Sequence, residues 1–323
     1  MLPAAAVAGT LEVGPGQQYA QPSAAAQVAQ AGDTVLIAPG EYFDCATWQA
    51  DRLTIAAAPG EGVVTITDKA CANKAAFIIE GSGVTVRGIG FARIRVPDDN
   101  GAGIRADGRD LTVQDSRFVN TQFGVLAASP GGGFLRIVGC TFEEQGTSLS
   151  GRTNFAVRAS GYDLLHIEHS SFAKARGGGD VSAVAGRTEL VDNQLRDEGG
   201  HMDGPLVTVE GGALLLQGNT VELAAGAAMR PGIVLATGEA SAIAVRGNTL
   251  TDAGAGATPL LRNWSTQEAT VRDNTVPAGT EAVSDAGVTY HRLRATAAGL
   301  RDSLHELYRQ ARHLAAALVH RFS

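Results

Sequence analysis

Four charged residues near the middle of the chain have the types and spacing for chemistry on an acidic sugar. β-Elimination from a uronate needs a cation that neutralises the substrate carboxylate and a base near the proton to be removed, and arginine is one residue that can serve. Arg105 and Arg158 are candidates on the outward side of neighbouring coils, with Arg176 and Asp180 in the insertion that follows. We predict Arg158, Arg105 and Asp180 as catalytic residues facing outward on consecutive coils of one groove. Solvated surface arginines are the alternative.

A further set of polar and aromatic residues could bind substrate. We predict Arg176, His201 and Asp203 as substrate contacts. Glycoside hydrolysis instead needs two carboxylates about 5–10 Å apart. The available clusters are Asp107 with Asp110, and Asp197, Glu198 and Asp203 around His201. A solvated acidic turn is the alternative for residues 197–203, and Trp48 and Trp264 can either stack on sugar rings or pack in the core.

Metal binding has one candidate segment, VPDDNGAG at 96–103. Asp98, Asp99 and Asn100 supply the oxygen ligands that Ca²⁺ prefers, although two adjacent acids in a glycine-bounded loop also suit an ordinary turn. His166 and His169 flank a predicted strand, where a spacing of three residues places side chains on opposite faces. We therefore predict no metal site or cofactor beyond this weak calcium candidate.

The elements that carry these residues come from a repeat. Its copies combine an alternating strand, a two-residue corner and a second short strand that ends in an apolar residue. They are VTVRGIGF (84–91), LTVQDSRF (111–118), LRIVGCTF (135–142), LHIEHSSF (165–172), TELVDNQL (188–195), LLLQGNTV (214–221), IAVRGNTL (243–250) and ATVRDNTV (269–276). Successive copies start 23 to 30 residues apart, which is a solenoid period with variable insertions.

A third apolar strand follows each insertion, as in GIRA (103–106), GVLA (124–127) and FAVR (155–158). One such coil has no interior of its own, so it buries its apolar side chains only by stacking on neighbouring coils. The pattern predicts an all-β, right-handed parallel β-helix with three strands per coil. About ten coils spaced by about 4.8 Å would form a rod roughly 50 Å long.

The corner of the repeat places polar side chains in one column. The residues in register are Ile89, Ser116, Cys140, Ser170, Asn193, Asn219, Asn248 and Asn274. Stacked asparagines can pass hydrogen bonds from a side-chain amide to the neighbouring coil, so we predict an asparagine ladder. Cys140 shares this column and is expected to be a buried small residue.

The other two cysteines suit a crosslink between coils. Cys45 and Cys71 are 26 residues apart, about one coil, which can place them side by side. We predict a disulfide that contributes about 3 kcal/mol by loop closure. A disulfide is in keeping with an exported protein.

Composition and the two ends of the chain divide it into four parts. Residues 1–8 are a possible signal-peptide stub, 9–34 an N-terminal cap with a helix from Ser23 to about Gln30, 35–285 the β-helix, and 286–323 an amphipathic helix. That last helix either covers the final coil or forms a coiled coil with an oligomer partner or an acidic partner. The net charge of -7 gives no support for a nucleic-acid partner, and no apolar run is long enough to span a membrane.

The segment AGDTVLIAPGEYFDC (31–45) and the GNT or DNT corners resemble the right-handed parallel β-helix proteins of the pectate-lyase-like superfamily, over about residues 10–280. The resemblance implies an exported protein, periplasmic or extracellular, that recognises a polysaccharide and that, if it is an enzyme, is a lyase of acidic glycans. Similar bacterial members carry His, Tyr, Lys and Arg on two coils that correspond to TNFAVR (153–158) and GGDVSAVAG (178–186). These segments have no His, Tyr or Lys. The alternative is therefore a non-catalytic glycan-binding or envelope protein that has lost the lyase-type residues.

Overall fold

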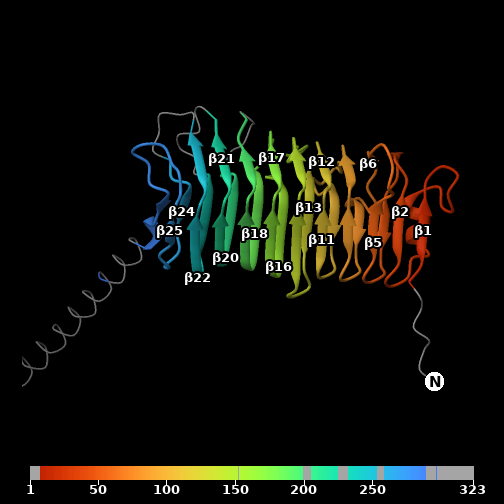
Figure 1. Cartoon of the computed structure of the whole chain (residues 1–323), viewed down its shortest axis with the longest axis horizontal. Coiled ribbons are helices and arrows are strands. Elements are labelled where there is room, and N and C mark those ends of the chain that lie inside the picture. Colours follow the sequence, from red (N-terminus) through yellow and green to blue (C-terminus); the bar gives the residue numbers. More distant parts are fainter. Residues whose placement is uncertain are drawn as a thin grey trace, which may run out of the picture.

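The chain winds into a right-handed parallel β-helix of about 10 coils, which confirms the predicted fold class. The computed structural model describes residues 8–151, 153–198, 205–224, 232–252 and 258–288 together with Thr296, and only the backbone of 237–239. Figure 1 shows the coils following one another along the long axis in sequence order. The described residues contain no helix with the length and hydropathy of a membrane span.

The strands lie on three faces, and most coils contribute one strand to each face. The first face leads into the corner of the repeat. Its strands are β1 (Thr10–Val13), β2 (Thr34–Ile37), β5 (Thr54–Ala57), β8 (Thr85–Arg87), β11 (Leu111–Gln114), β14 (Phe134–Val138), β25 (Thr270–Arg272) and the later parts of β16 (Phe155–Glu168), β18 (Gly179–Val191), β20 (Val207–Gln217) and β22 (Ile233–Arg246).

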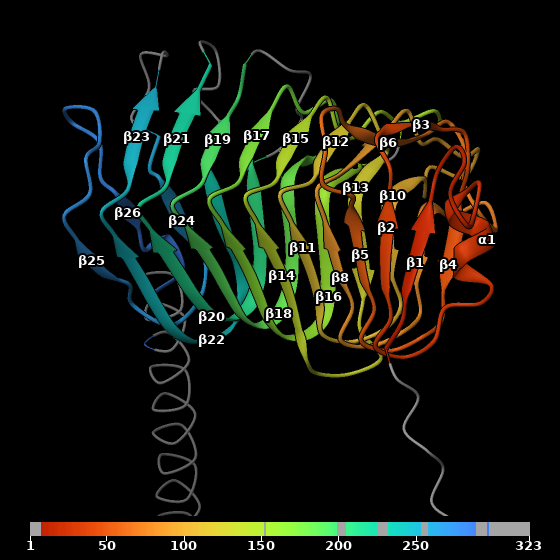
Figure 2. The ribbon, with the colours of Figure 1, turned by 45° about the vertical axis from the view of Figure 1, so that its right-hand side comes forward.

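The second face follows the corner and is a 9-stranded parallel sheet, visible in Figure 2 as one row of strands. Its strands are β3 (Gly40–Tyr42), β6 (Val64–Thr67), β9 (Ile89–Ala92), β12 (Arg117–Val119), β15 (Thr141–Glu143), β17 (Ser171–Ala173), β19 (Gln194–Arg196), β21 (Thr220–Leu223) and β23 (Thr249–Asp252). The third face follows the insertions. It contains β4 (Ala46–Trp48), β7 (Ala75–Ile79), β10 (Ala102–Ala106), β13 (Phe123–Ala128), β24 (Leu261–Asn263), β26 (Val283–Ser284) and the early parts of β16, β18, β20 and β22.

A column of phenylalanines fills the core behind the second face. The rings of Phe91, Phe118, Phe142 and Phe172 stack with centroids 5.1, 4.7 and 4.7 Å apart. The side chains of the third face must be small where they lie opposite these rings. A Cβ added at Gly103 would lie 2.7 Å from Phe118, and one added at Gly124 would lie 2.7 Å from Phe142. The glycines of the third face therefore allow the two faces to pack closely.

The predicted asparagine ladder is confirmed. Asn193, Asn219 and Asn248 each direct their backbone N–H to the side-chain oxygen of the next asparagine, at 3.0, 2.9 and 2.9 Å. The Ser170 N–H likewise donates to Asn193, and the Cys140 N–H donates to the Ser170 hydroxyl. Cys140 is buried and free, as predicted, and burial raises the pKa of its thiol to about 12. This column satisfies polar groups at a turn that water does not reach.

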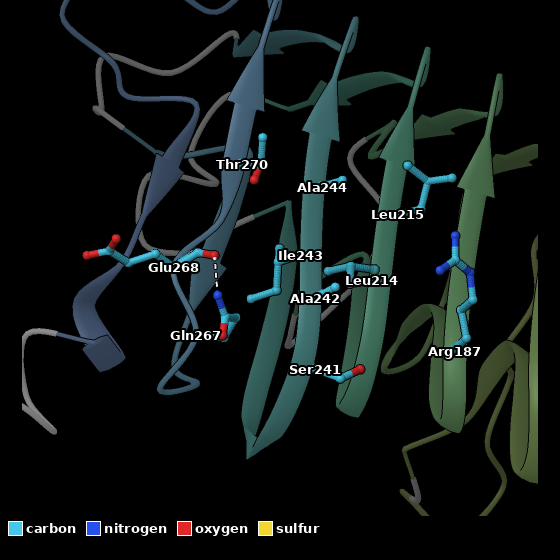
Figure 3. Close-up of a pocket in the computed structure, with 10 residues that line it drawn as sticks. All are labelled: Arg187, Leu214, Leu215, Ser241, Ala242, Ile243, Ala244, Gln267, Glu268 and Thr270. Atoms are coloured by element: carbon cyan, nitrogen blue, oxygen red, sulfur yellow. Dashed lines mark hydrogen bonds between the residues drawn. The ribbon is translucent and has the colours of Figure 1, made fainter.

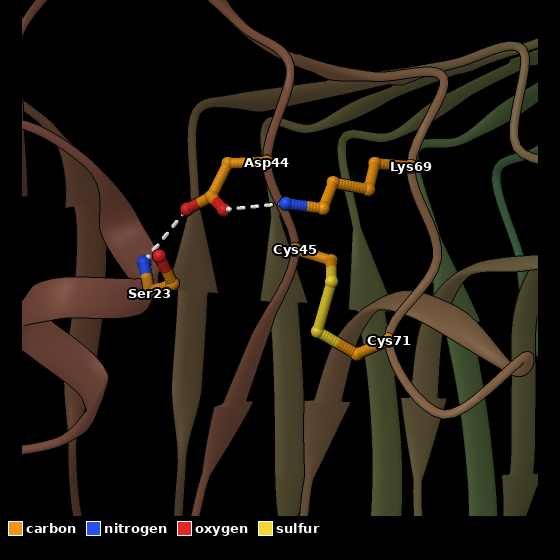
Figure 4. The surroundings of a disulfide bond; sticks show 5 residues. All are labelled: Ser23, Asp44, Cys45, Lys69 and Cys71. Carbon is orange, nitrogen blue, oxygen red and sulfur yellow. Dashed lines mark hydrogen bonds and ion pairs between the residues drawn. A yellow bond between two sulfur atoms is a disulfide. The ribbon is translucent and has the colours of Figure 1, made fainter.

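The N-terminal coils are fastened to their cap. Helix α1 (Pro22–Ala26) is shorter than the predicted segment, which ended near Gln30. The buried Asp44 carboxylate accepts a hydrogen bond of 2.8 Å from the Ser23 N–H in the first turn of α1, and it lies 3.7 Å from the Lys69 ammonium. The adjacent residue, Cys45, forms the predicted disulfide with Cys71 (Figure 4). Disulfide and ion pair thus connect the same two segments.

The other end of the molecule extends beyond the described residues. Residues 286–288 and Thr296 are helical. The rest of the predicted C-terminal helix, with its two alternative roles, lies outside the described residues, as do residues 1–7 of the predicted signal-peptide stub.

Candidate functional site

The outward side of the third face brings together residues from most of the chain. Because the strands are parallel and in register, one outward column passes through successive coils. Its residues are Ile78, Arg105, Leu126, Arg158, Ser182, Thr208, Val234 and Arg262. Two residues further along each strand, the same register gives a second outward column of Asp107, Ala128, Ser160, Val184, Glu210, Ala236 and Trp264. These two columns are the candidate site.

Arg158 is an exposed cation near the middle of this surface. Its side chain is exposed, and it has no hydrogen-bond or ion-pair partner within the described part of the chain. Its neighbours in the column are Leu126 on one side and Ser182 on the other. A guanidinium among apolar and hydroxyl side chains keeps its donors free for a planar anion such as a carboxylate.

Arg105 differs from Arg158 in both position and charge balance. Its Nε lies 3.0 and 3.3 Å from the two carboxylate oxygens of Asp107, so its charge is already paired. The strand of Leu126 separates the two arginines. The expectation that they occupy consecutive coils is therefore wrong. They are two strand spacings apart, about 10 Å along the rod, because a full coil intervenes between residues 107 and 155.

Asp180 does not face the groove, and the expectation of an outward carboxylate is wrong. Its side chain is 1% exposed, because its register partner is Ala156, in the inward column that also contains Gly103 and Gly124. Burial and, to a lesser extent, the charge of Asp197 raise its pKa well above the usual range of an aspartate. One oxygen of Asp180 and one of Asp197 are buried without a hydrogen-bond partner.

Of the three predicted substrate contacts, Arg176 is the one within the described residues, and it lies in the insertion between β17 and β18. The Arg176 guanidinium donates to the Glu144 carboxylate at 2.7 Å, in an exposed pair between neighbouring insertions. His201 and Asp203 lie outside the described residues.

The calcium candidate is occupied by hydrogen-bond donors from the protein itself. The Asp99 carboxylate accepts from Gln122 Nε2 at 2.7 Å and, from the insertion that follows β15, from the Leu149 N–H at 2.7 Å and the Ser150 N–H at 2.8 Å. The hydroxyls of Ser148 and Ser150 also donate to it. Burial by itself would raise the Asp99 pKa, but these hydrogen bonds together lower it to about 2. Calcium binding at Asp99 would have to displace these donors, and the calcium site stays a prediction.

A cluster of two acids and a histidine at one corner was not predicted from the sequence. Glu168, His169 and Asp192 have ligand atoms within 4.8 Å of one another at an exposed corner, where His169 pairs with both acids. Parallel register creates this cluster, since Glu168 is opposite Val191 and the neighbouring corner residues then meet.

A depression of about 290 Å³ lies on the first face, shown in Figure 3. It is lined mainly by small and apolar residues such as Leu215, Ala244 and Thr270. Its cation, Arg187, is paired with Glu189. The third face is therefore better suited to a charged ligand than this depression is.

Comparison with known proteins agrees at the level of fold. No protein-family model and no curated protein sequence matches the chain. Among solved structures it is similar to the PL6 family alginate lyase AlyGC, in a mutant form with a TM-score of 0.59 and 17% identity, and in another structure with 0.56 and 16%. Each alignment covers 83% of this chain and 40% of AlyGC, so the chain spans less than half of that protein. The molecule shares the parallel β-helix fold of lyases of this type.

Proposed function

We propose that this protein binds an acidic polysaccharide along the third face, with Arg158 receiving a sugar carboxylate. The observation that carries the proposal is the exposed guanidinium of Arg158, which has no partner among the described residues and lies on a surface of mostly small side chains. An extended glycan can lie across parallel strands because successive coils repeat the same outward positions. The fold likeness to an alginate lyase supports a polysaccharide as the ligand, and the disulfide supports an exported protein.

A lyase of uronate-containing glycans is the second candidate, favoured by the same arginine and the same fold likeness. Elimination needs a base as well as a cation. The described outward side chains around Arg158 are Leu126, Ser160, Ser182 and Val184, and none of them titrates as a base near neutral pH. Tyr162 is buried, its hydroxyl donates to the Gly108 carbonyl, and burial raises its pKa. Among the residues that the structure describes, Arg158 would have to act in both roles, so their geometry supports binding better.

Affinity electrophoresis in gels containing alginate or polygalacturonate tests the binding proposal. We expect Arg158→Ala to weaken retention at least tenfold, because a hydrogen bond to a charged group contributes about 1.5–3 kcal/mol. Arg117→Ala is the matched control, since Arg117 is an exposed arginine on the second face, paired with Glu143. Retention should also weaken as salt increases. Equal retention of the two variants, or no retention of the wild type in any uronate gel, would contradict the proposal.

Ultraviolet absorbance of unsaturated uronate products tests the lyase candidate on the same polymers. A rising signal that Arg158→Ala abolishes would establish elimination. Retention in the gel without any such signal would leave a binding protein.

A further inference from the structure

Trp264 is the exposed aromatic residue at the far end of the third face. Its side chain is 39% exposed, whereas the other tryptophan, Trp48, is 0% exposed in the core beside Phe77. Leu261 and Asn263 are fully buried, so strand alternation directs Arg262 and Trp264 outward together. Register places them in the two outward columns that also contain Arg158 and Ser160.

Hydrogen bonds and a close packing contact hold the backbone around Trp264 in place. The Trp264 N–H donates to the Leu235 carbonyl at 3.0 Å. The Asn263 side chain donates to Asp285 and to the Gln267 carbonyl, and it accepts from both the N–H and the hydroxyl of Ser265. A Cβ added at Gly287 would lie 2.2 Å from the Trp264 carbonyl carbon, so that segment packs directly on the tryptophan backbone. The indole is therefore exposed on a rigid support, which lowers the entropic cost of using it in binding.

Arg262 adds a cation on the same outward face as the indole. It has no hydrogen-bond or ion-pair partner among the residues that the structure describes. Four strand spacings separate it from Arg158, through β18, β20 and β22, which is roughly 19 Å. The side chains on the surface between them are small and mostly neutral, with Ser182, Thr208 and Val234 in one column. Glu210 is the charged residue of the other column in the described part of that interval.

We infer that Arg262 and Trp264 form a second sugar subsite, with a pyranose ring stacked on the indole and its carboxylate on the guanidinium. This inference rests on the proposed function and extends it. The glycan lies parallel to the rod axis and spans several sugar units from Arg158 to Trp264. An aromatic platform supplies apolar area for the C–H face of a sugar, and the neighbouring cation selects an acidic one.

Tryptophan fluorescence tests the subsite without altering the protein. The probes are short and long size-fractionated oligosaccharides of alginate and polygalacturonate. We expect long chains to change the emission and to protect it from acrylamide quenching, since Trp264 is accessible and Trp48 is not. Trp264→Phe assigns the change, because it leaves Trp48 as the only tryptophan.

Affinity for the same probes completes the test. Trp264→Ala and Arg262→Ala should each weaken binding of long chains about three- to tenfold and leave short chains unaffected, whereas Arg158→Ala weakens both. Glycan binding that depends on Arg158 but leaves Trp264 emission and quenching unchanged with the longest chains would overturn the subsite and leave the proposed function standing. No binding by the wild type would overturn both. Thermal melting of each variant checks that it is folded.

Discussion

Asn219 shows how one side chain can satisfy polar groups of two neighbouring coils. Its oxygen accepts from the Asn193 backbone N–H at 3.0 Å and from the Asn193 side-chain amide at 3.1 Å. Its own amide donates to the Leu190 carbonyl and to the Asn248 side chain. Asn219 is 1% exposed, so none of these partners would find water if the side chain were removed.

Replacing Asn219 is therefore expected to be costly. Asn219→Ala leaves at least one buried donor and one buried acceptor unpaired and should lower the free energy of unfolding by about 2–4 kcal/mol. Asn219→Ser should cost less, because Ser170 accepts from the neighbouring coil through its hydroxyl in the same column. Urea denaturation of the two variants measures the difference. A serine variant as unstable as the alanine variant would show that the ladder does not act through this hydrogen bond.

Asp180 is a residue whose stability effect depends on pH. Its folded-state pKa is raised above the unfolded value near 3.8 by burial and by Asp197. The folded state then binds the proton more tightly than the unfolded state. Stability is highest below the unfolded pKa and falls as pH rises from there through the raised folded pKa.

Asp180→Leu should remove this loss of stability. Leu206 occupies the same inward column in the next coil, so the position tolerates a leucine. We expect the variant to gain about 1–3 kcal/mol over the wild type at neutral pH and to show a flatter pH dependence above about pH 4. Thermal or urea unfolding at several pH values measures both effects, with Asp180→Asn as the isosteric comparison. A variant less stable than wild type at pH 7 would mean that the carboxylate is ionised and held by a partner.

At the scale of elements, the insertion that follows β15 is tied to an insertion of an earlier coil. Leu149 and Ser150 donate to Asp99 across one intervening coil, and Gln122 of that coil donates to the same carboxylate. These bonds lower the Asp99 pKa to about 2 against the effect of burial. The long insertion after β15 can therefore be ordered, because several of its donors bind the one buried carboxylate of Asp99.

Asp99→Asn should loosen this connection. A pKa lowered from 3.8 to about 2 corresponds to about 2 kcal/mol, present above the unfolded pKa and lost as pH falls toward 2. We expect the variant to be less stable than wild type by about that amount at pH 7, and the difference to vanish in acid. Urea denaturation at the two pH values measures it. Glu61→Gln, at an exposed acid, is the control and should change stability by less than about 0.5 kcal/mol.

At the scale of the whole molecule, the rod changes its internal composition halfway along its length. In the earlier coils the second face carries the stacked rings from Phe91 to Phe172, and the corner two residues before each ring is Ile, Ser or Cys. In later coils Leu195, Val221 and Leu250 continue the same register, and the corner is Asn. Large rings with corners of Ile, Ser or Cys, and smaller aliphatics with corners of Asn, both keep the interior filled, as close packing requires.

This change coincides with the candidate site. Arg158 lies in β16, the coil whose second-face strand carries Phe172, the last stacked ring. The second subsite at Trp264 lies toward the C-terminal end, among the asparagine coils. A ligand that spans both would run along the rod past the change in packing.

Local repetition explains what was predictable. The strands, the corner column from Ile89 to Asn274 and the link between Cys45 and Cys71 all follow from a period of about one coil, because each depends only on neighbouring coils. The buried state of Cys140 follows from the same column. Sequence alone therefore determined the fold, the ladder and the disulfide.

The composition of the third face was decided only by the tertiary structure. Insertions of variable length separate its strands, so the number of coils between Arg105 and Arg158 depends on where each third-face strand begins. The inward direction of Asp180 depends on consecutive inward positions at the start of that strand, which a simple alternation does not predict. Arg158 and Trp264 share a face because the register of four strand pairings adds up between them. Sequence periodicity specifies each coil, but only the hydrogen-bonded register between coils specifies which side chains meet.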